Sequence, residues 1–155
     1  MPAQIALRPA GLQDFRYCET LYFAGMEQII RQLNLDLGAQ ITSFQQQWEP
    51  AQVQIITLTG RDVGWLQTMT AKDALFLAQL FVEPPVQRQG VGTEVMRRVI
   101  GEASRNGRAV ELAVVKINPA LRLYERLGFH VTHEDEHKFY MRREADDATR
   151  CLRCE

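Results

Sequence analysis

One succession between residues 74 and 105 constrains the fold of this chain more than any other: an apolar run, a short glycine-bearing loop and an amphipathic helical pattern. The apolar run, 74–82, predicts a strand that is buried on both faces. The loop, Gln87-Arg88-Gln89-Gly90-Val91-Gly92-Thr93, then places backbone N–H groups at the positive end of a helix dipole. Such an end holds phosphate oxygens without a cationic side chain, so the loop predicts a site for a phosphorylated cofactor.

The segments before this region alternate between helical and strand patterns. Apolar residues at helical spacing predict a helix over 12–30, which Gly25 breaks or kinks. Pro50 ends a second short helix over 41–48. Strands are expected at 4–8, 53–58 and 63–69, with a hairpin turn over 59–62 between the last two.

The segments after the loop also alternate between helical and strand patterns. Val91, Val95, Val99 and Ala103 predict the buried stripe of a helix that ends at Asn106-Gly107. A buried strand over 110–115 comes next, and Asn118-Pro119 then starts a helix with asparagine at the N-cap, closed by Gly128. The last two strands are expected at 129–132 and 138–142.

These elements predict an α/β fold, a mixed α+β sandwich in the order β-α-α-β-β-β-α-β-α-β-β. We expect one central mixed sheet of about six to seven strands with helices on both faces. The region 82–110 forms a strand–helix–strand crossover with the glycine loop at the carboxyl end of its first strand. A single domain over 4–143 is followed by a polar tail over 144–155.

Composition excludes several classes of function. The chain has 155 residues, 46% of them hydrophobic and 24% charged, with a net charge of −1, so it has no global attraction to nucleic acid or anionic membranes. No apolar run approaches the ~20 residues of a membrane span, and the N-terminus has no signal-peptide pattern, so we expect a cytoplasmic protein.

The three cysteines are Cys18, Cys151 and Cys154, an odd number that argues against a disulfide framework. Cys151 and Cys154 form a lone C-x-x-C, which is either a metal or redox pair or two tail thiols. We favour two tail thiols and expect no metal site, because no second ligand pair accompanies them.

The loop matches neither common nucleotide motif. A Walker loop needs G-x-x-x-x-G-K-[ST], and the run contains no lysine. A dinucleotide fingerprint needs G-x-G-x-x-G, and Gly90-Val91-Gly92 supplies only its first two glycines. ATP and NAD are therefore weak candidates for the phosphorylated ligand.

Two motifs resemble the GNAT N-acetyltransferase superfamily. Its acetyl-CoA loop has Gln or Arg, two residues, Gly, one residue, then Gly or Ala, and Gln87, Gly90 and Gly92 fill this pattern. Downstream, Asn118-Pro119-Ala120, Leu123-Tyr124 and Leu127-Gly128-Phe129 resemble the superfamily's carboxyl-terminal signature. The two motifs occur in the family's order, and the resemblance covers roughly residues 4 to 143.

The resemblance implies acetyl-CoA as the acyl donor and assigns roles at matching positions. The pantetheine arm would pair with the backbone of Leu80 and Val82, on either side of Phe81, in the manner of strand addition. Tyr124 would protonate the leaving thiolate, and the Leu80 N–H would stabilise the oxyanion. The remaining cofactor contacts would come from the loop and from one downstream residue: Gln87, Arg88, Gln89, Gly90, Val91, Gly92, Thr93 and Asn118.

Each of these residues also has a purely structural interpretation. Asn118 makes a good helix cap whatever the function, and Tyr124 has the spacing of a core residue. Arg88 is either a solvated loop charge or a phosphate contact. Glu83 is interpreted as solvated and Trp65 as a packing residue.

One position departs from the family's pattern. Many relatives carry a glutamate in the fourth strand that deprotonates the amine, whereas the run here is Leu77-Ala78-Gln79-Leu80. The general base is therefore unassigned, with Glu27, His133, His137 and a water chain as candidates by residue type alone.

The resulting functional hypothesis is an acetyl-CoA-dependent N-acetyltransferase that acts on a primary amine of a small molecule or peptide. The alternative is a non-catalytic module that binds or senses acyl-CoA, because Ala78 stands in place of a carboxylate. The acidic residues in the segments that would form the acceptor site are interpreted as a solvated face. A homodimer is compatible with the resemblance, and composition does not bear on it.

Overall fold

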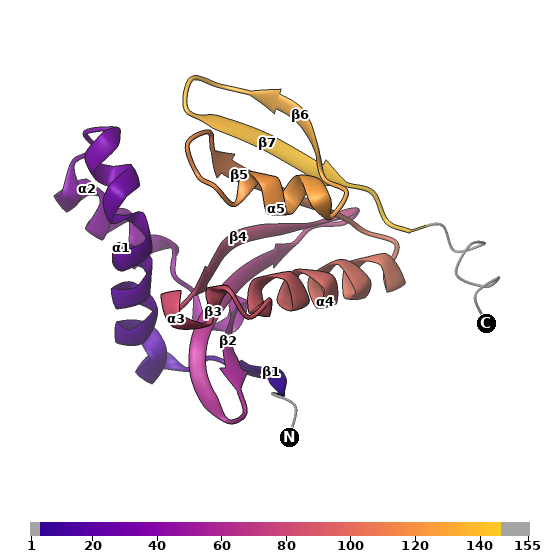
Figure 1. The fold of residues 1–155 in the computed structure, drawn as a ribbon, viewed down its shortest axis with the longest axis horizontal. Helices are drawn as coiled ribbons and strands as arrows, with labels where there is room; N and C mark the ends of the chain where they lie inside the picture. Colours follow the sequence, from indigo (N-terminus) through magenta and orange to yellow (C-terminus); the bar gives the residue numbers. More distant parts are fainter. Residues whose placement is uncertain (1–3, 147–155) are drawn as a thin grey trace. The chain divides into compact units, whose positions relative to one another are not determined.

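The computed structural model describes residues 4–146 (Figure 1). These residues form two compact units. Unit 1 comprises residues 4–68 and 79–92, and unit 2 comprises residues 69–78 and 93–146. The boundary falls inside β4 (Ala74–Val82) and inside the first turn of α4 (Val91–Arg105), so each of these elements contributes to both units. Cys151 and Cys154 lie outside the described residues.

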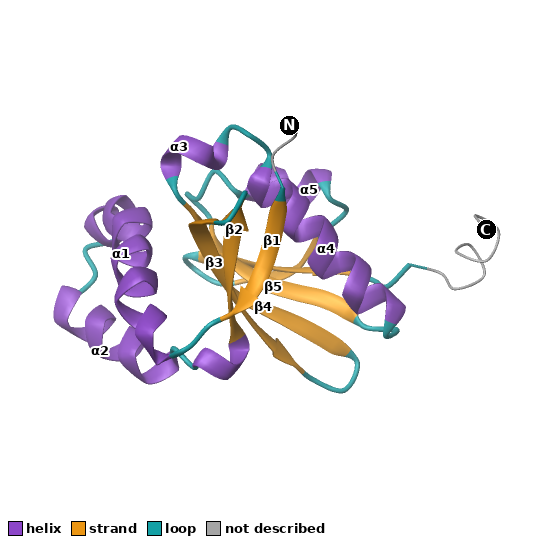
Figure 2. Cartoon of the chain, turned by 90° about the horizontal axis from the view of Figure 1, so that it is seen from below, coloured by secondary structure: helices purple, strands orange, loops and turns teal. Residues whose placement is uncertain are grey.

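The chain folds into seven strands, five α-helices and two 3₁₀ turns within the described part (Figure 2). In chain order these are β1 (Ile5–Pro9), η1 (Leu12–Asp14), α1 (Phe15–Gln32), α2 (Leu37–Gln47), η2 (Pro50–Gln52), β2 (Val53–Leu58), β3 (Arg61–Thr70), β4, α3 (Pro84–Gln87), α4, β5 (Ala109–Val115), α5 (Leu121–Arg126), β6 (His130–Glu134) and β7 (Lys138–Arg143). The hydrogen-bonded strand order is β1-β2-β3-β4-β5-β7-β6. This confirms the predicted mixed sheet, while α3 and both 3₁₀ turns are absent from the prediction.

The β2–β3 hairpin of unit 1 follows directly from its turn residues. Thr59 and Gly60 both have positive φ, 50° and 83°, which is the geometry of a two-residue type I′ turn. The turn sets the register that pairs Leu58 with Arg61 and Thr57 with Asp62.

Unit 1 buries an aromatic-rich core between its helices and its strands. Cys18 of α1 and Trp65 of β3 are fully buried, and the Phe44 ring of α2 meets the Trp65 ring edge-on at 5.9 Å. α1 runs without interruption through Gly25, so the predicted break is wrong: a glycine inside a packed helix lowers stability without ending the helix. α2 starts before the predicted residue 41 because the Asp36 carboxylate caps it, accepting from the Ala39 N–H at 2.8 Å.

In unit 2 the α4 stripe is confirmed, and the predicted double burial of β4 is wrong. Val91, Val95, Val99 and Ala103 are all buried, and Gly107 has the φ of +67° expected after a helix end. Along β4 only Ala74 and Leu77 are buried. The parallel ladder with β5 extends from Ala74 to Leu77 and ends there, so the second half of β4 lies beyond it, while Leu75 and Phe76 are half-buried within it.

An ion-pair network in unit 1 joins β1 to η1 and β3. The Arg8 guanidinium donates to Asp14 at 3.0 and 3.1 Å and to Asp62 at 3.0 Å, while the Gly11 N–H donates to the same Asp14 carboxylate at 2.9 Å. Asp14 is one of the two polar residues buried in the described part of the chain. The hydrogen bond from Arg8 holds the pKa of Asp14 below its usual range.

Replacing Arg8 tests this network. Arg8→Gln leaves a buried carboxylate without its charged partner, so we expect the free energy of unfolding to fall by about 2 kcal/mol in urea titrations. The matched control Arg98→Gln removes an exposed pair with Glu94, at a cost of about 0.5 kcal/mol or less. A depressed folded-state pKa contributes stability above the unfolded pKa near 4 and loses it as pH falls, so the effect of Arg8→Gln should shrink at acidic pH. An equal cost for both variants at neutral pH would contradict this role.

Candidate functional site

The glycine loop is anchored to the end of β4 through a short helix that the sequence did not predict. α3 begins with Pro84-Pro85, which supply the φ of a first helical turn and need no N–H partners there. Val86 is buried beneath it, and the Gln87 side chain donates to the Val82 carbonyl oxygen at 2.8 Å. Gln87 thus has a structural role in this motif, because its side-chain hydrogen bond joins the loop to the end of β4.

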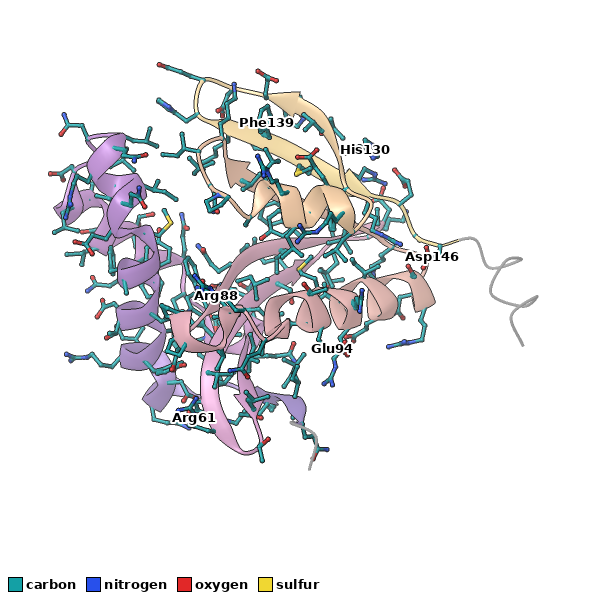
Figure 3. All side chains as sticks on the ribbon, in the orientation of Figure 1. Arg61, Arg88, Glu94, His130, Phe139 and Asp146 are labelled. Atoms are coloured by element: carbon teal, nitrogen blue, oxygen red, sulfur yellow. The ribbon has the colours of Figure 1, made fainter. Side chains whose placement is uncertain are left out.

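The loop itself has the geometry of an anion cradle. Gly90 adopts φ +78°, a left-handed conformation that glycine reaches at least cost, and α4 begins at the next residue. A Cβ at Gly92 would meet no atom within 4 Å. Arg88 and Gln89 are exposed between α3 and α4, and Arg88 is labelled in Figure 3. The first N–H groups of the 15-residue α4, including that of Thr93, have no carbonyl partner within the helix. This arrangement fits a phosphate group.

The end of β4 approaches β3 at a point where a side chain has no room. A Cβ on Gly64 would fall well inside contact distance of the Phe81 carbonyl oxygen and 3.1 Å from the Val82 Cα. The Glu83 N–H donates to the Val63 carbonyl oxygen at 2.8 Å just beyond this point. Leu80, Phe81 and Val82 are half-buried. Gly64 therefore sets the path of the backbone segment expected to pair with an extended ligand.

α1 supplies two contacts to this segment that the sequence did not reveal. The Tyr22 ring lies edge-on to Phe81 with 5.2 Å between ring centroids, and a Cβ on Gly25 would come within 2.9 Å of the Phe81 ring. Tyr22 belongs to the apolar stripe of the predicted helix, which indicates only packing, and Gly25 is predicted only as a break or kink. The Trp65 ring stacks on the Phe81 ring with 5.7 Å between ring centroids, and Trp65 is fully buried, which confirms its packing role.

Glu83 is not a solvated loop charge, as the sequence suggested. Its carboxylate accepts a hydrogen bond of 2.6 Å from the Tyr17 hydroxyl of α1. Burial, followed by this hydrogen bond to Glu83, raises the pKa of Tyr17. The two residues are 66 positions apart, which no local pattern can connect. Their hydrogen bond ties α1 to the start of α3.

In unit 2, the Asn118 side chain closes the turn before α5. Its side-chain oxygen accepts from the Ala120 N–H at 2.9 Å, and the helix proper begins at Leu121 instead of directly after Asn118. The prediction of Asn118 as the N-cap of this helix is wrong, because residues 118–120 form a turn and Ala120, whose side chain makes no capping bond, is the N-cap of α5. The side-chain NH₂ of Asn118 has no hydrogen-bond partner among residues 4–146, so it is free to donate to a ligand.

Tyr124 lies on α5 with 9% of its surface exposed. Its ring meets Phe129 at 5.9 Å, and no side-chain hydrogen bond within the described residues engages its hydroxyl. Burial raises the pKa of Tyr124 to about 12. The residue packs as its spacing predicts, and it also presents a phenol that stays protonated across the physiological pH range.

The candidate bases occupy different settings. Glu27 of α1 pairs with Arg31 at 2.8 Å, and its side chain is 67% exposed. His133 stacks on Tyr140 with ring centroids 4.3 Å apart, and His137 lies 3.8 Å from the Glu136 carboxylate. Ala78 is half-buried on β4. The surroundings of these residues do not identify any one of them as the general base.

Within the described residues, no three metal-ligating side chains cluster, and no helix has both the length and the apolarity to cross a membrane.

Comparisons with known proteins agree with this geometry. A family model described as an acetyltransferase (GNAT) domain matches residues 49–131, which include the glycine loop and Tyr124. An uncharacterized N-acetyltransferase of Methanocaldococcus jannaschii is 33% identical over 70 residues, which cover 44% of this chain and 31% of that relative. The match therefore spans about a third of the relative's length.

Solved structures show the same fold at low sequence identity. The PaiA N-acetyltransferase of Thermoplasma acidophilum, solved in complex with coenzyme A, has a TM-score of 0.73 and 12% identity, over 91% of this chain and 99% of that one. The ribosomal-protein-S18-alanine N-acetyltransferase of Escherichia coli has a TM-score of 0.66 and 21% identity, over 94% and 96% of the two chains.

Replacing Gly64 tests the close approach of β4. Gly64→Ala forces the Phe81–Val82 backbone to move, so we expect the free energy of unfolding to fall by about 1 to 3 kcal/mol. The control is Gly38→Ala on α2, where the nearest atom to a new Cβ is 3.5 Å away. Helix propensity makes that change neutral or stabilising by up to ~1 kcal/mol. Urea unfolding of both variants measures the difference, and a Gly64→Ala protein as stable as its parent would contradict this account.

Proposed function

This chain belongs to the GNAT acetyltransferase family, and on that premise we propose that it transfers the acetyl group of acetyl-CoA to a primary amine of a small molecule or peptide. The observation that carries the proposal is the cradle formed by Gly90, with its left-handed backbone, and the free N–H groups that open α4. It suits a ligand with a diphosphate and lacks the lysine of an ATP loop.

In this proposal the loop holds the pyrophosphate of coenzyme A through backbone N–H groups of 87–93. Gly92 supports the assignment, because open space surrounds the position of its absent Cβ. Arg88 is exposed and forms no ion pair with any residue in 4–146, so it is free to contact a phosphate. The Thr93 hydroxyl adds a further donor.

The pantetheine arm follows the backbone of 80–82 in the manner of strand addition. The ladder between β4 and β5 ends at Leu77, so it does not use the backbone groups of the following residues. The Val82 carbonyl already accepts from Gln87, and its second lone pair remains for the ligand. The free NH₂ of Asn118 is assigned to the pantetheine or thioester end.

Acetyl-CoA supplies an activated thioester. In direct transfer, the lone pair of the neutral amine forms the new C–N bond and the C–S bond breaks. The Leu80 N–H is assigned to the oxyanion, and the Tyr124 phenol donates a proton to the departing sulfur. The amine's own proton leaves to a base that is still unassigned, since Ala78 offers no carboxylate. No cysteine nucleophile is needed.

The second candidate is a module that binds acyl-CoA without catalysis. Ala78, in place of the carboxylate found in many relatives, favours it. The same cradle would bind coenzyme A in both cases, and only turnover separates them.

Calorimetry and turnover test the proposal together. We expect acetyl-CoA to bind in isothermal titration, and coenzyme A to be released with a member of a panel of small amines and peptides with free N-termini. Tyr124→Phe should leave the acetyl-CoA affinity within about twofold and lower kcat by about 10²-fold or more, the usual contribution of a general acid. The matched control Tyr140→Phe removes an exposed hydroxyl that binds Asp135 and should change neither quantity.

Each failure has a distinct meaning. Absence of acetyl-CoA binding rejects the whole proposal. Binding without thiol release across the panel supports the non-catalytic module. Unchanged kcat in Tyr124→Phe rejects the acid while leaving the transferase activity in place.

The pKa of Tyr124 also predicts the alkaline behaviour. Burial raises this pKa to about 12, so the phenol keeps its proton as pH rises through 10. Activity should therefore rise with pH as the amine loses its proton and then level off, with no decrease from Tyr124 below about pH 11. A profile of kcat against pH measures this. A decrease with an apparent pKa near 9 that disappears in the residual activity of Tyr124→Phe would show that the phenol ionises earlier.

A further inference from the structure

Lys116 joins the end of β5 to the β6–β7 hairpin of unit 2. It directly follows Val115, the last residue of β5, and its N–H donates to the His137 carbonyl oxygen at 2.8 Å. Its side-chain Nζ donates to the Glu134 carboxylate at 2.9 Å and lies 5.1 Å from the centroid of the Phe139 ring, which is labelled in Figure 3. Because the Lys116 side chain is only 30% exposed, both contacts are better shielded from water than those of a solvated surface lysine.

The hairpin that receives these contacts is held in shape by its own turn. The Asp135 carboxylate accepts hydrogen bonds from the His137 N–H at 2.9 Å and the Lys138 N–H at 2.8 Å. The Asp135 N–H in turn donates to the Lys138 carbonyl oxygen at 3.0 Å. An aspartate that bonds the backbone two residues onward fixes a turn of this kind. Lys116 is therefore attached to a well-defined part of the hairpin.

On its other side, Lys116 leads to Asn118. The Asn118 N–H donates to the Val115 carbonyl oxygen at 2.9 Å, so Lys116 and Ile117 are the two central residues of a β-turn. Ile117 is 48% exposed, whereas the Lys116 side chain holds the turn to the hairpin. The Asn118 side-chain oxygen accepts from the Ala120 N–H at 2.9 Å, just after this turn. The direction in which the Asn118 NH₂ points thus depends on where the turn lies.

We propose that Lys116 is a positioning residue for acetyl-CoA binding, because it holds the turn that orients the Asn118 NH₂. This inference rests on the proposed function, in which that NH₂ binds the pantetheine or thioester end of acetyl-CoA. Removing the Lys116 charge releases the turn from Glu134 and Phe139 and leaves Asn118 itself unchanged. The affinity should then fall only for ligands that reach Asn118.

Two ligands separate this role from a general effect on folding. Acetyl-CoA has the pantetheine arm, whereas phosphoadenosine diphosphate is the nucleotide half of coenzyme A and lacks that arm. In isothermal titration of the full chain, Lys116→Met should weaken acetyl-CoA binding about fivefold and leave binding of the nucleotide half unchanged. Lys116→Arg keeps a cation that can pair with Glu134 and lie over Phe139, so its acetyl-CoA affinity should stay within about twofold of the parent's.

A double-mutant cycle tests whether Lys116 acts through Asn118. Asn118→Ala should weaken acetyl-CoA binding by itself, and adding Lys116→Met should weaken it no further, because no NH₂ is left to position. Glu134→Lys is a second variant at an exposed side chain, and it places a like charge against Lys116. It should also weaken acetyl-CoA binding and spare the nucleotide half. The matched control is Lys138→Met, because Lys138 is exposed and forms no ion pair within residues 4–146. It should change neither affinity.

The results that would overturn the positioning role differ from those that reject the transferase. An unchanged acetyl-CoA affinity in Lys116→Met or Glu134→Lys rejects the positioning role alone. An equal loss for both ligands shows that Lys116 only stabilises the fold. A further loss in the double variant, or no loss in Asn118→Ala, shows that Lys116 does not act through Asn118. A parent protein that does not bind acetyl-CoA rejects the proposed function, and the positioning role with it.

Discussion

The close approach of β4 to Gly64 is the constraint on which unit 1 depends. Because no side chain fits there, the backbone of Phe81 and Val82 comes against β3, and the Glu83 N–H then reaches the Val63 carbonyl. Once Glu83 is fixed, its carboxylate meets Tyr17 of α1, and Val82 offers its carbonyl to Gln87. The position of α3, and with it the start of the glycine loop, follows from these contacts.

This chain of contacts explains which parts of the fold the sequence predicts. The β2–β3 hairpin and the buried stripe of α4 depend on local chemistry, a Thr-Gly turn in one case and helical periodicity in the other, and both are confirmed. The predicted turn over 59–62 is two residues too long, because Arg61 and Asp62 already pair within β3. α3 is too short for periodicity to reveal, and its two prolines also suit the end of a strand. The role of Gly64 and the Tyr17–Glu83 bond depend on tertiary neighbours that no window of sequence contains.

The candidate site divides in the same way. Composition and spacing predict a phosphate cradle at Gly90 without naming its ligand, and the choice of coenzyme A depended on the resemblance of two motifs to the GNAT family. For Asn118 the structure shows a hydrogen bond within the turn before α5, while the ligand role remains a prediction. For Tyr124 the spacing favours packing and the motif favours an acid. A packed ring with an unbonded hydroxyl that keeps some accessible surface is compatible with both.

The burial of Tyr124 has a chemical consequence. Burial raises the pKa of Tyr124 to about 12, whereas a thiol has a pKa of about 8.5. Complete transfer of a proton from this phenol to a free thiolate is therefore uphill by roughly 5 kcal/mol, at about 1.4 kcal/mol per pKa unit. A hydrogen bond that strengthens as charge develops on sulfur has no such cost, since the proton stays largely on oxygen. In the proposed transfer the phenol would therefore donate its proton in step with C–S cleavage and not before it, and the proton that the amine gives to the base would afterwards restore the phenol.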